Sequence, residues 1–317
     1  MNIKKTLMYS SNKKMNSNIK ITVITSLYNC INYLDGYFDN LTKLSNTNNI
    51  EVLLLHNLPS NIELSIINQK LPSYPFVKHI IIPKREGLYT TWNRGIMLAN
   101  GEYLCIWNVD DIRTPDSIID QAETLDKNQD AELTYGDFYY MFKYPTPSNV
   151  LVNNKDFLID KRAFFRSHQI GCFPMWRKRI HNKIGYFDEQ LKLVADFDFQ
   201  IRVARTGCII KTDKVIGYYL ENVPNKLSSN LYMQTTERNV LYLRYGTFDL
   251  FNWLTIVPIL KHYKIYSLLY NDKKNNISKQ FDSYKVFIGK RLPLLLLSIF
   301  RQPRFILAYI KHNILNK

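Results

Sequence analysis

Short apolar runs alternate with amphipathic segments along the first third of the chain. Each run ends at a polar or proline-containing loop, which is the pattern of a buried strand. The predicted strands are residues 21–26, 51–55, 77–82 and 102–107. Helical periodicity fills residues 33–44 and 88–99, and Asn100-Gly101 closes the second of these helices. This alternation predicts an α/β fold with a mostly parallel sheet and helices on both faces.

Polar side chains follow each of the four predicted strands. In an open parallel sheet the carboxyl ends of the strands meet at one edge, and ligands bind there. The sequence therefore predicts that four dipeptides gather at that edge: Thr25-Ser26, His56-Asn57, Lys84-Arg85 and Asp110-Asp111.

Two carboxylates, Asp110 and Asp111, come almost directly after the fourth predicted strand. A carboxylate beside an apolar core is unfavourable unless a cation compensates its charge. Such hard oxygen ligands suit Mg²⁺ or Mn²⁺, which bind through one or two carboxylates together with substrate phosphates. The alternative is that Asp111 caps the segment that begins at Ile112, while Asp110 lies in a solvated turn. These residues alone leave both interpretations open.

Several longer segments follow one another in a defined order. They are ITVITSLYN at 21–29, GLYTTWNRGI at 87–96, NVDD at 108–111, MWR at 175–177, IGYFDE at 184–189 and DFDFQIR at 196–202. In this order and spacing, the chain resembles family 2 glycosyltransferases over about residues 20–220. The resemblance implies a GT-A-type fold, a nucleotide-diphosphate sugar donor with UDP as the favoured nucleotide, inversion at the anomeric carbon, and a metal site of the DxD type.

The resemblance also implies a set of donor-binding residues, in which Tyr28 packs against the base and Mn²⁺ or Mg²⁺ is held by Asp110 and Asp111. Alternatives are that Tyr28 is an ordinary loop aromatic and that Asn93 is a buried structural amide. The full predicted donor set is Thr25, Ser26, Tyr28, Asn57, Asn93, Asn108, Val109 and Asp110.

On the acceptor side, the resemblance implies that Asp196 is the general base. The acceptor hydroxyl must lose its proton as it attacks the anomeric carbon, and a positioned carboxylate accepts that proton. Asp198 is expected to pair with Arg202 four residues later. Trp176-Arg177 is interpreted either as an acceptor platform or as core packing with a surface charge.

Three positions depart from the family pattern. His56-Asn57 stands where the family usually has paired aspartates that contact the base, although an Asn carbonyl still accepts a hydrogen bond from a ring N–H. Asn108 occupies the first DxD position, and Ala195 replaces the acidic residue before Asp196. We therefore expect base recognition and metal affinity to differ from the usual pattern.

The composition, 46% hydrophobic and 14% aromatic over 317 residues, indicates a globular protein with one substantial core. The chain has 42 basic and 27 acidic residues, and this net charge of +15 favours polyanionic partners. Its basic residues are dispersed without a recognisable motif, so we expect no specific nucleic-acid partner. The four cysteines show neither a zinc nor a disulfide spacing. We expect a cytoplasmic protein, because signal-peptide and membrane-span patterns are missing.

The chain changes character after the last family-like segment. We expect a flexible leader over 1–18, a catalytic domain over 19–225 with donor and acceptor halves at 19–115 and 116–225, and a helical, basic C-terminal region over 226–317. The C-terminal region alternates apolar and basic clusters. This pattern fits either a helical cap on the catalytic domain or peripheral contact with an anionic membrane.

The leading hypothesis is an inverting glycosyltransferase of the hexosyltransferase type, which acts on a glycan, a lipid-linked sugar or a protein-linked acceptor. A nucleotidyltransferase is an alternative, but it would typically have a glycine-rich loop after the first strand, and residues 26–29 contain no glycine. A catalytically degenerate binding or scaffold protein is a second alternative. The changes at His56-Asn57 and Asn108 keep this alternative open. Asp110, Asp111 and Asp196 oppose it.

Overall fold

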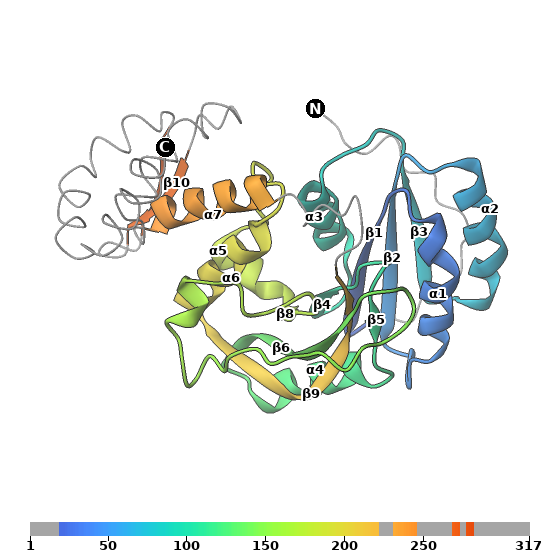
Figure 1. The fold of residues 1–317 in the computed structure, drawn as a ribbon, viewed down its shortest axis with the longest axis horizontal. Helices are drawn as coiled ribbons and strands as arrows, with labels where there is room; N and C mark the ends of the chain where they lie inside the picture. Colours follow the sequence, from blue (N-terminus) through green and yellow to red (C-terminus); the bar gives the residue numbers. More distant parts are fainter. Residues whose placement is uncertain (1–18, 222–230, 246–267, 273–276, 282–317) are drawn as a thin grey trace, which may run out of the picture. The chain divides into compact units, whose positions relative to one another are not determined.

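The computed structural model describes residues 19–221, 231–245, 268–272 and 277–281. The chain divides into two compact units, Met1–Lys226 and Leu227–Lys317. Within the described part of the first unit, nine strands form one sheet in the order β3-β2-β1-β4-β8-β6-β9-β5, with β7 paired to β6 (Figure 1).

The strands of the first unit are β1 (Ile21–Leu27), β2 (Ile50–Asn57), β3 (Val77–Ile82), β4 (Tyr103–Ile106), β5 (Ile112–Arg113), β6 (Ala131–Met141), β7 (Leu151–Val152), β8 (Met175–Arg177) and β9 (Cys208–Leu220). Its helices are α1 (Ile31–Thr42), α2 (Asn61–Lys70), α3 (Leu88–Leu98), α4 (Ser117–Lys127), α5 (His181–Ile184) and α6 (Ala195–Thr206). Short 3-10 turns are η2 (Leu71–Ser73), η3 (Ala163–Phe165) and η4 (Lys178–Ile180).

The four strands predicted from the sequence are β1 to β4, and they form the parallel part of the sheet. β1 pairs in parallel with β2 on one side and with β4 on the other, and β2 pairs in parallel with β3. Every residue of β2 is buried, as expected for a strand covered on both faces. The predicted α/β architecture is therefore confirmed for this half.

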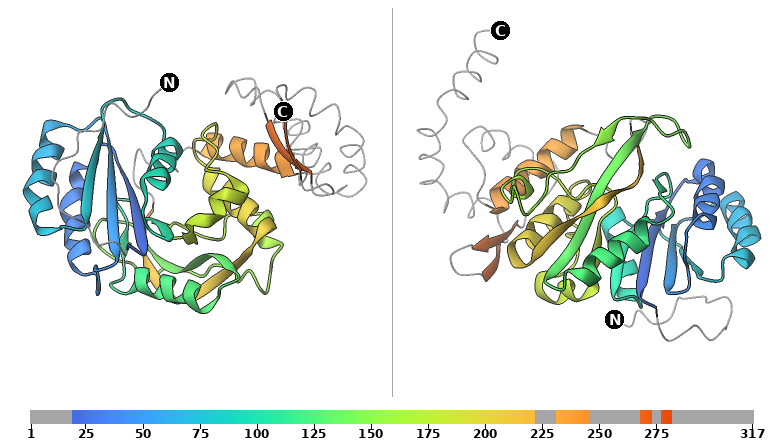
Figure 2. Two further views of the ribbon diagram at one scale, coloured as in Figure 1. Left: turned by 180° about the vertical axis from the view of Figure 1, so that it is seen from behind. Right: turned by 90° about the horizontal axis from the view of Figure 1, so that it is seen from below.

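Helices cover both faces of the parallel strands, as Figure 2 shows from two further directions. Alternate residues of β1 such as Val23 and Leu27 pack in one core with apolar residues of α1, α2 and α4. The opposite face carries α3, where a side chain at Gly95 would place a Cβ 2.6 Å from Cγ2 of Ile24. Gly95 therefore allows α3 to lie close to β1.

The second half of the sheet is mixed. β8 runs antiparallel to β4 and also to β6, while β6 and β9 are parallel to each other over a register with several irregularities. β5 closes the far edge through antiparallel pairing with β9. β8 belongs to the predicted acceptor half, so its pairing with β4 joins that half to the predicted donor half within one sheet.

In the second unit the structure describes α7 (Leu231–Tyr245) and an antiparallel hairpin of β10 (Leu268–Asp272) and β11 (Ile277–Phe281). The helix lies in the region predicted to be helical, whereas the hairpin was not indicated by that pattern. Among the helices of the described ranges, none has both the length and the apolar character needed to cross a membrane. The predicted leader at 1–18 lies outside the described residues, as do 246–267 and 282–317 of the predicted helical, basic C-terminal region.

Candidate functional site

The loops that follow β1 and β4 begin side by side at the carboxyl edge of the sheet. Ile24 of β1 is in register with Ile106 of β4, and the N–H of Trp107 donates to the carbonyl of Ile24 at 3.1 Å. The Trp107 ring also packs 5.1 Å from that of Tyr37. This pairing fixes where the chain leaves the sheet before Asp110.

The two aspartates after β4 have different environments. Asp111 is fully buried, and its carboxylate accepts hydrogen bonds from the Asn108 amide at 2.9 Å and from the N–H of Leu220 at 3.2 Å. Its carbonyl accepts from the Trp107 indole at 3.0 Å. Asp110 is partly exposed. Asp111 therefore anchors the loop to β9, and Asp110 is the carboxylate of the pair that solvent reaches.

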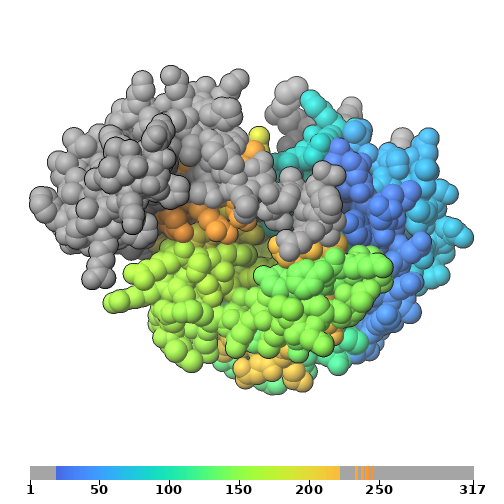
Figure 3. All heavy atoms as spheres, in the orientation of Figure 1, coloured from blue at the N-terminus to red at the C-terminus, as the bar shows by residue number. Residues whose placement is uncertain are grey.

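The turn after β6 lies against α1, close to this aspartate pair. The rings of Tyr33 and Tyr144 meet edge to face at 5.1 Å, and in Figure 3 the surface of the segment near residue 140 adjoins that of the first helices. Burial, and then the negative charge of Asp110, raises the pKa of Tyr144 above its usual value. Tyr144 is thus a neutral, half-buried phenol beside the predicted metal carboxylate.

The residues that leave β1 point in different directions. Thr25 is fully buried, and its hydroxyl lies 2.6 Å from that of Tyr37 on α1. Ser26 is partly exposed. Tyr28 is 36% exposed, and the guanidinium of Arg85 lies over its ring at 4.0 Å from the centroid. The accessible aromatic surface beyond β1 is therefore that of Tyr28, and its partner comes from the loop after β3.

Asn57 at the end of β2 is buried and connects two neighbouring segments. Its amide nitrogen donates to the hydroxyl of Thr91 at 2.9 Å, and its amide oxygen accepts from the N–H of Glu86 at 3.0 Å. Glu86 in turn binds the Arg94 guanidinium through both carboxylate oxygens, at 2.9 and 2.7 Å. Asn57 thus fixes the loop that carries Arg85 and the first turn of α3.

Asn93 on α3 is also buried, and it holds the segment before α6. Its amide donates to the carbonyl of Phe187 at 2.9 Å and to the Glu189 carboxylate at 2.8 Å, and its oxygen accepts from the N–H of Phe187 at 2.9 Å. The predicted donor residue therefore connects the nucleotide half to the acceptor half.

Asp196 lies in the first turn of α6, and 35% of its side chain is exposed. Its Oδ1 accepts from the N–H of Phe197 at 2.8 Å and from the Tyr89 hydroxyl at 3.4 Å. The Nε2 atom of His168 lies 3.9 Å from its Oδ2. Sequence reasoning missed Tyr89 and His168 at this position, because both approach from segments distant along the chain.

Trp176 and Arg177 of β8 lie in the interior rather than on a surface that faces an acceptor. Trp176 is fully buried, and its indole donates to His181 Nε2 at 2.9 Å. The Arg177 guanidinium binds the carbonyls of Ala131 and Leu125 at 2.9 and 2.7 Å. Neither side chain can present a face to a sugar in this conformation, so the core-packing interpretation describes both.

Asp198 is buried beside Arg202 as predicted, with an ion pair of 2.8 Å between Oδ2 and Nε. The Arg202 guanidinium also donates to the carbonyl of Ile184 at 2.6 Å. This buried pair ties α6 to α5. The prediction that Asp198 has a structural role is confirmed, and it leaves Asp196 as the solvent-accessible carboxylate of the first turn.

Comparison with known proteins gives several relatives and many solved structures. The chain is 24% identical over 192 residues to the uncharacterized glycosyltransferase YwdF of Bacillus subtilis, covering 59% of this chain and 69% of that protein. S. aureus TarS 1-349 in complex with UDP-GlcNAc has a TM-score of 0.57 and 18% identity, over 77% of this chain and 73% of that one. Mannosyltransferase PcManGT from Pyrobaculum calidifontis in complex with GDP-Man and Mn²⁺ has a TM-score of 0.51 and 15% identity, over 78% and 69%.

These likenesses bear on the fold. Both solved neighbours are GT-A glycosyltransferases, so the mixed sheet with flanking helices is the GT-A fold that the sequence predicts. The chain spans between 37% and 69% of the length of the curated relatives that it matches. The model of "Glycosyl transferase family 2" matches residues 22–185, just over half of the chain. With its strands, its helices and its segments in the order of that family, this chain belongs to glycosyl transferase family 2.

Proposed function

We propose that this protein transfers a sugar from a nucleotide-diphosphate sugar, with UDP as the favoured nucleotide, to an acceptor hydroxyl with inversion at the anomeric carbon. The observation that carries the proposal is the pair of loops at the carboxyl edge, where partly exposed Asp110 follows β4 directly beside β1. Ligands bind at this edge in open α/β sheets. The solved neighbours with UDP-GlcNAc and with GDP-Man and Mn²⁺ support a nucleotide-sugar donor and a divalent metal.

The proposed donor site uses the exposed groups of this edge. Tyr28, stacked on Arg85, offers an aromatic face to the base, and Ser26 adds a hydroxyl. Asn57 and Asn93 act on the donor by holding the loops and helix around it, since their amides already bind protein groups. Thr25 acts in the same indirect way through Tyr37.

Asp110 is the proposed metal ligand, with Asn108 and the backbone of Val109 shaping the loop. These residues fit a hard cation, because the carboxylate oxygens of Asp110 are partly exposed and the buried Asp111 holds the loop in place. Both carboxylate oxygens of Asp111 already accept hydrogen bonds, one from Asn108 and one from Leu220. Asp111 would therefore bind the metal only through its remaining lone pairs. Bound Mn²⁺ or Mg²⁺ would stabilise the negative charge of the departing diphosphate.

Asp196 is the proposed base. Its carboxylate is accessible, and the Tyr89 hydroxyl and the Phe197 N–H hold Oδ1, which leaves Oδ2 on the side of His168 to accept the proton of the acceptor hydroxyl. We propose a glycan, a lipid-linked sugar or a protein-linked sugar as the acceptor. Trp176 and Arg177 are not included in its binding site, because both are buried.

Thermal denaturation with a panel of nucleoside diphosphates and nucleotide sugars, with and without Mn²⁺, tests the donor site. A ligand at about 100 times its Kd stabilises the folded state by roughly 2.7 kcal/mol. We expect stabilisation by one nucleoside diphosphate that requires metal and is lost in Asp110→Ala. Asp130→Ala is the matched control, because Asp130 is exposed and precedes β6 at the opposite edge of the sheet.

The alternatives give different results. Donor binding without sugar transfer to a glycan, a lipid-linked sugar or a protein-linked sugar would identify a degenerate binding protein. Release of pyrophosphate from a nucleoside triphosphate would identify a nucleotidyltransferase. Metal-independent binding that survives Asp110→Ala would remove Asp110 from the proposed site.

A further inference from the structure

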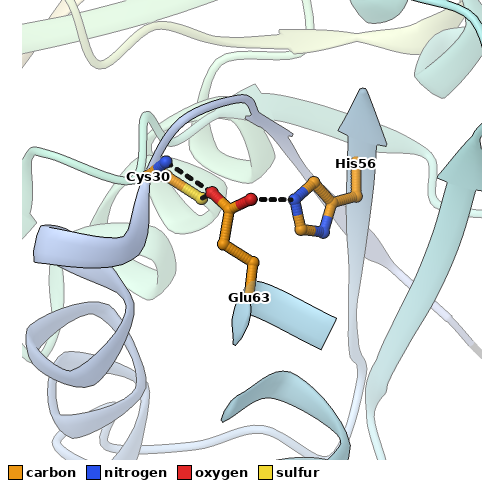
Figure 4. A group of neighbouring side chains, drawn as sticks. All are labelled: Cys30, His56 and Glu63. Atoms are coloured by element: carbon orange, nitrogen blue, oxygen red, sulfur yellow. Dashed lines mark hydrogen bonds and ion pairs between the residues drawn. The ribbon is translucent and has the colours of Figure 1, made fainter. Parts of the chain in front are cut away.

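A buried group of metal-binding side chains lies behind the loop that carries Tyr28. Cys30 precedes α1, His56 lies near the end of β2, and Glu63 lies in the first turn of α2, as Figure 4 shows. One ligand atom from each residue lies within 4.8 Å of the others, and all three residues are buried. Three separate elements therefore bring a thiol, an imidazole and a carboxylate together.

Glu63 provides a negative charge inside the protein. Its Oε1 accepts from the N–H of Cys30 at 2.7 Å, and its Oε2 accepts from the N–H and hydroxyl of Ser60 at 2.9 and 2.8 Å. Burial acts to raise the pKa of Glu63, but these hydrogen bonds outweigh it and hold the pKa at about 2. The carboxylate is therefore ionised at neutral pH.

His56 has an incompletely satisfied ring that faces this carboxylate. The residue is fully buried, and its Nδ1 lies 3.0 Å from Nε2 of His79. Its Nε2 lies 3.6 Å from Oε2 of Glu63, which is too long for a hydrogen bond, and this atom has no hydrogen-bond partner. Burial lowers the pKa of His56, so the ring is neutral and has a single N–H.

The hydrogen bond to His79 is compatible with the proton on either nitrogen of His56, because either ring can be its donor. Burial also lowers the pKa of His79, to about 4, so both rings are neutral. If His56 donates from Nδ1 to His79, a lone pair on Nε2 points toward the Glu63 carboxylate, and a cation bound between them would relieve this repulsion. Metal-bound histidines commonly donate their other ring N–H to a neighbouring acceptor in this way.

We propose that Cys30, His56 and Glu63 bind Zn²⁺, with His79 as the outer partner that orients the His56 ring. The Sγ of Cys30 is 3.4 Å from Oε1 of Glu63, and Nε2 of His56 is 3.6 Å from Oε2. In a tetrahedral site with bonds of about 2.0 Å to N and O and about 2.3 Å to S, neighbouring ligand atoms lie roughly 3.3 to 3.5 Å apart. These two distances involve different oxygens of the Glu63 carboxylate. With one ligand atom from each residue, the three atoms lie within 4.8 Å of one another, so a zinc ion would draw them together by up to about 1.3 Å.

The ligand chemistry selects zinc over the metal proposed at Asp110. A thiolate with an imidazole suits Zn²⁺, whereas Mg²⁺ and Mn²⁺ prefer oxygen ligands. Burial, followed by the negative charge of Glu63, raises the pKa of Cys30, so the residue is a thiol without metal. Zinc binding to the thiolate would therefore release the thiol proton to solvent.

A metal at this position would tie the β1–α1 turn to β2 and α2. These are the elements that support the loop of Tyr28, so the site would stabilise the nucleoside side of the edge without touching the donor. No ligand spacing in the sequence predicts this zinc site, because its ligands come from three elements and include no CxxC pair.

Metal analysis and cobalt substitution of the full chain test the proposal. We expect the purified protein to retain stoichiometric zinc, and a chelator to lower its Tm by several degrees. Co²⁺ added to the chelated protein should give a thiolate-to-metal charge-transfer band in the near ultraviolet. The band reports a cysteine ligand, so binding at the Asp110 site cannot produce it.

Single substitutions show whether Cys30 and His56 bind the metal. Cys30→Ser should abolish the charge-transfer band, and His56→Gln should weaken retention of zinc at least tenfold. Cys208→Ser should leave both unchanged, because Cys208 begins β9, outside the cluster. Circular dichroism verifies folding, and the chelated wild-type protein provides a readout if a variant fails to fold.

Absence of zinc from protein purified in zinc-supplemented medium, together with no cobalt band, would overturn the proposal. His79 would then donate to His56, whose Nε2–H would point to Glu63 in a purely hydrogen-bonded core. A band that persists in Cys30→Ser would likewise refute this location. Neither result depends on glycosyl transfer, so failure here is distinguishable from failure of the proposed function.

Discussion

The amide of Asn93 pairs with the backbone of Phe187 in both directions, donating to its carbonyl and accepting from its N–H at 2.9 Å each. The side chain thus provides the hydrogen bonds that a neighbouring strand would provide. Because Asn93 is on α3 and Phe187 precedes α6, this contact joins the helix beside the donor edge to the segment that leads to Asp196.

Asn93→Ala should therefore destabilise the protein. It leaves the buried N–H and carbonyl of Phe187 without their partner, which costs about 1 to 3 kcal/mol for such groups. Urea denaturation measures the loss, and Met97→Ala on the exposed side of the same helix is the control. Unchanged stability combined with weaker donor binding would instead indicate direct contact with the donor.

Asp196→Asn should retain donor binding and lose sugar transfer. The amide preserves the shape of the side chain but is a very weak base, and general base catalysis typically contributes 10²- to 10⁴-fold. We expect turnover to fall by about that factor while the thermal shift with nucleoside diphosphate stays the same. Asp130→Asn is the control. Wild-type turnover by Asp196→Asn would remove this residue from the mechanism.

Tyr28→Ala should weaken binding of the nucleoside diphosphate. Stacking of a base on an aromatic side chain contributes about 1 to 3 kcal/mol, so we expect a Kd raised roughly 5- to 150-fold. Tyr28→Phe keeps the ring and should bind within about twofold of wild type. Calorimetric titration distinguishes the two variants, and equal affinity in all three proteins would show that Tyr28 is only a loop aromatic.

The stability of the protein should fall as the pH drops below neutral, in part through His181. Its Nε2 accepts from the Trp176 indole, and its Nδ1 lies 2.9 Å from the carbonyl of Gly185, so a proton on Nε2 would break the bond to Trp176. Burial lowers the pKa of His181 to about 4, against about 6.5 in an unfolded chain.

The direction of this pH dependence follows from the pKa of His181 in the folded and the unfolded state. Above about pH 6.5 both states are neutral and the contribution of His181 is fully present. Between there and about pH 4 the unfolded chain binds the proton first, so the free energy of unfolding decreases as the pH falls. Urea midpoints across this range should drop less in His181→Gln than in wild type. An equal drop in both proteins would assign the effect to other groups such as His79.

The apolar runs of the sequence were sufficient to predict the parallel half of the sheet. The predicted strand at 77–82 coincides with β3, and the other three agree with β1, β2 and β4 to within two residues at each end. The helix predicted at 88–99 is α3 to within one residue. These elements are readable because a short buried strand and an amphipathic helix each leave a local pattern. The order of the family-like segments also identified the fold.

Tertiary structure decided which polar side chains reach solvent. Thr25 and Asn57 stand at the strand ends that the sequence selected, yet both are buried and bound to other segments. The antiparallel insertion of β8 likewise buries Trp176 and Arg177. A motif gives the position of a residue along the chain, whereas the face it occupies depends on which strands and helices pack beside it.

The same limit applies to the groups that meet from distant segments. His168 reaches Asp196 from an irregular segment, and Cys30, His56 and Glu63 converge from three separate elements. Local periodicity carries no information about such meetings, because they depend on the path of the chain between elements. The sequence by itself determined the parallel strands, the edge at which their polar loops gather and the positions of the aspartates along the chain. The packing of the elements determined which side chains face one another there.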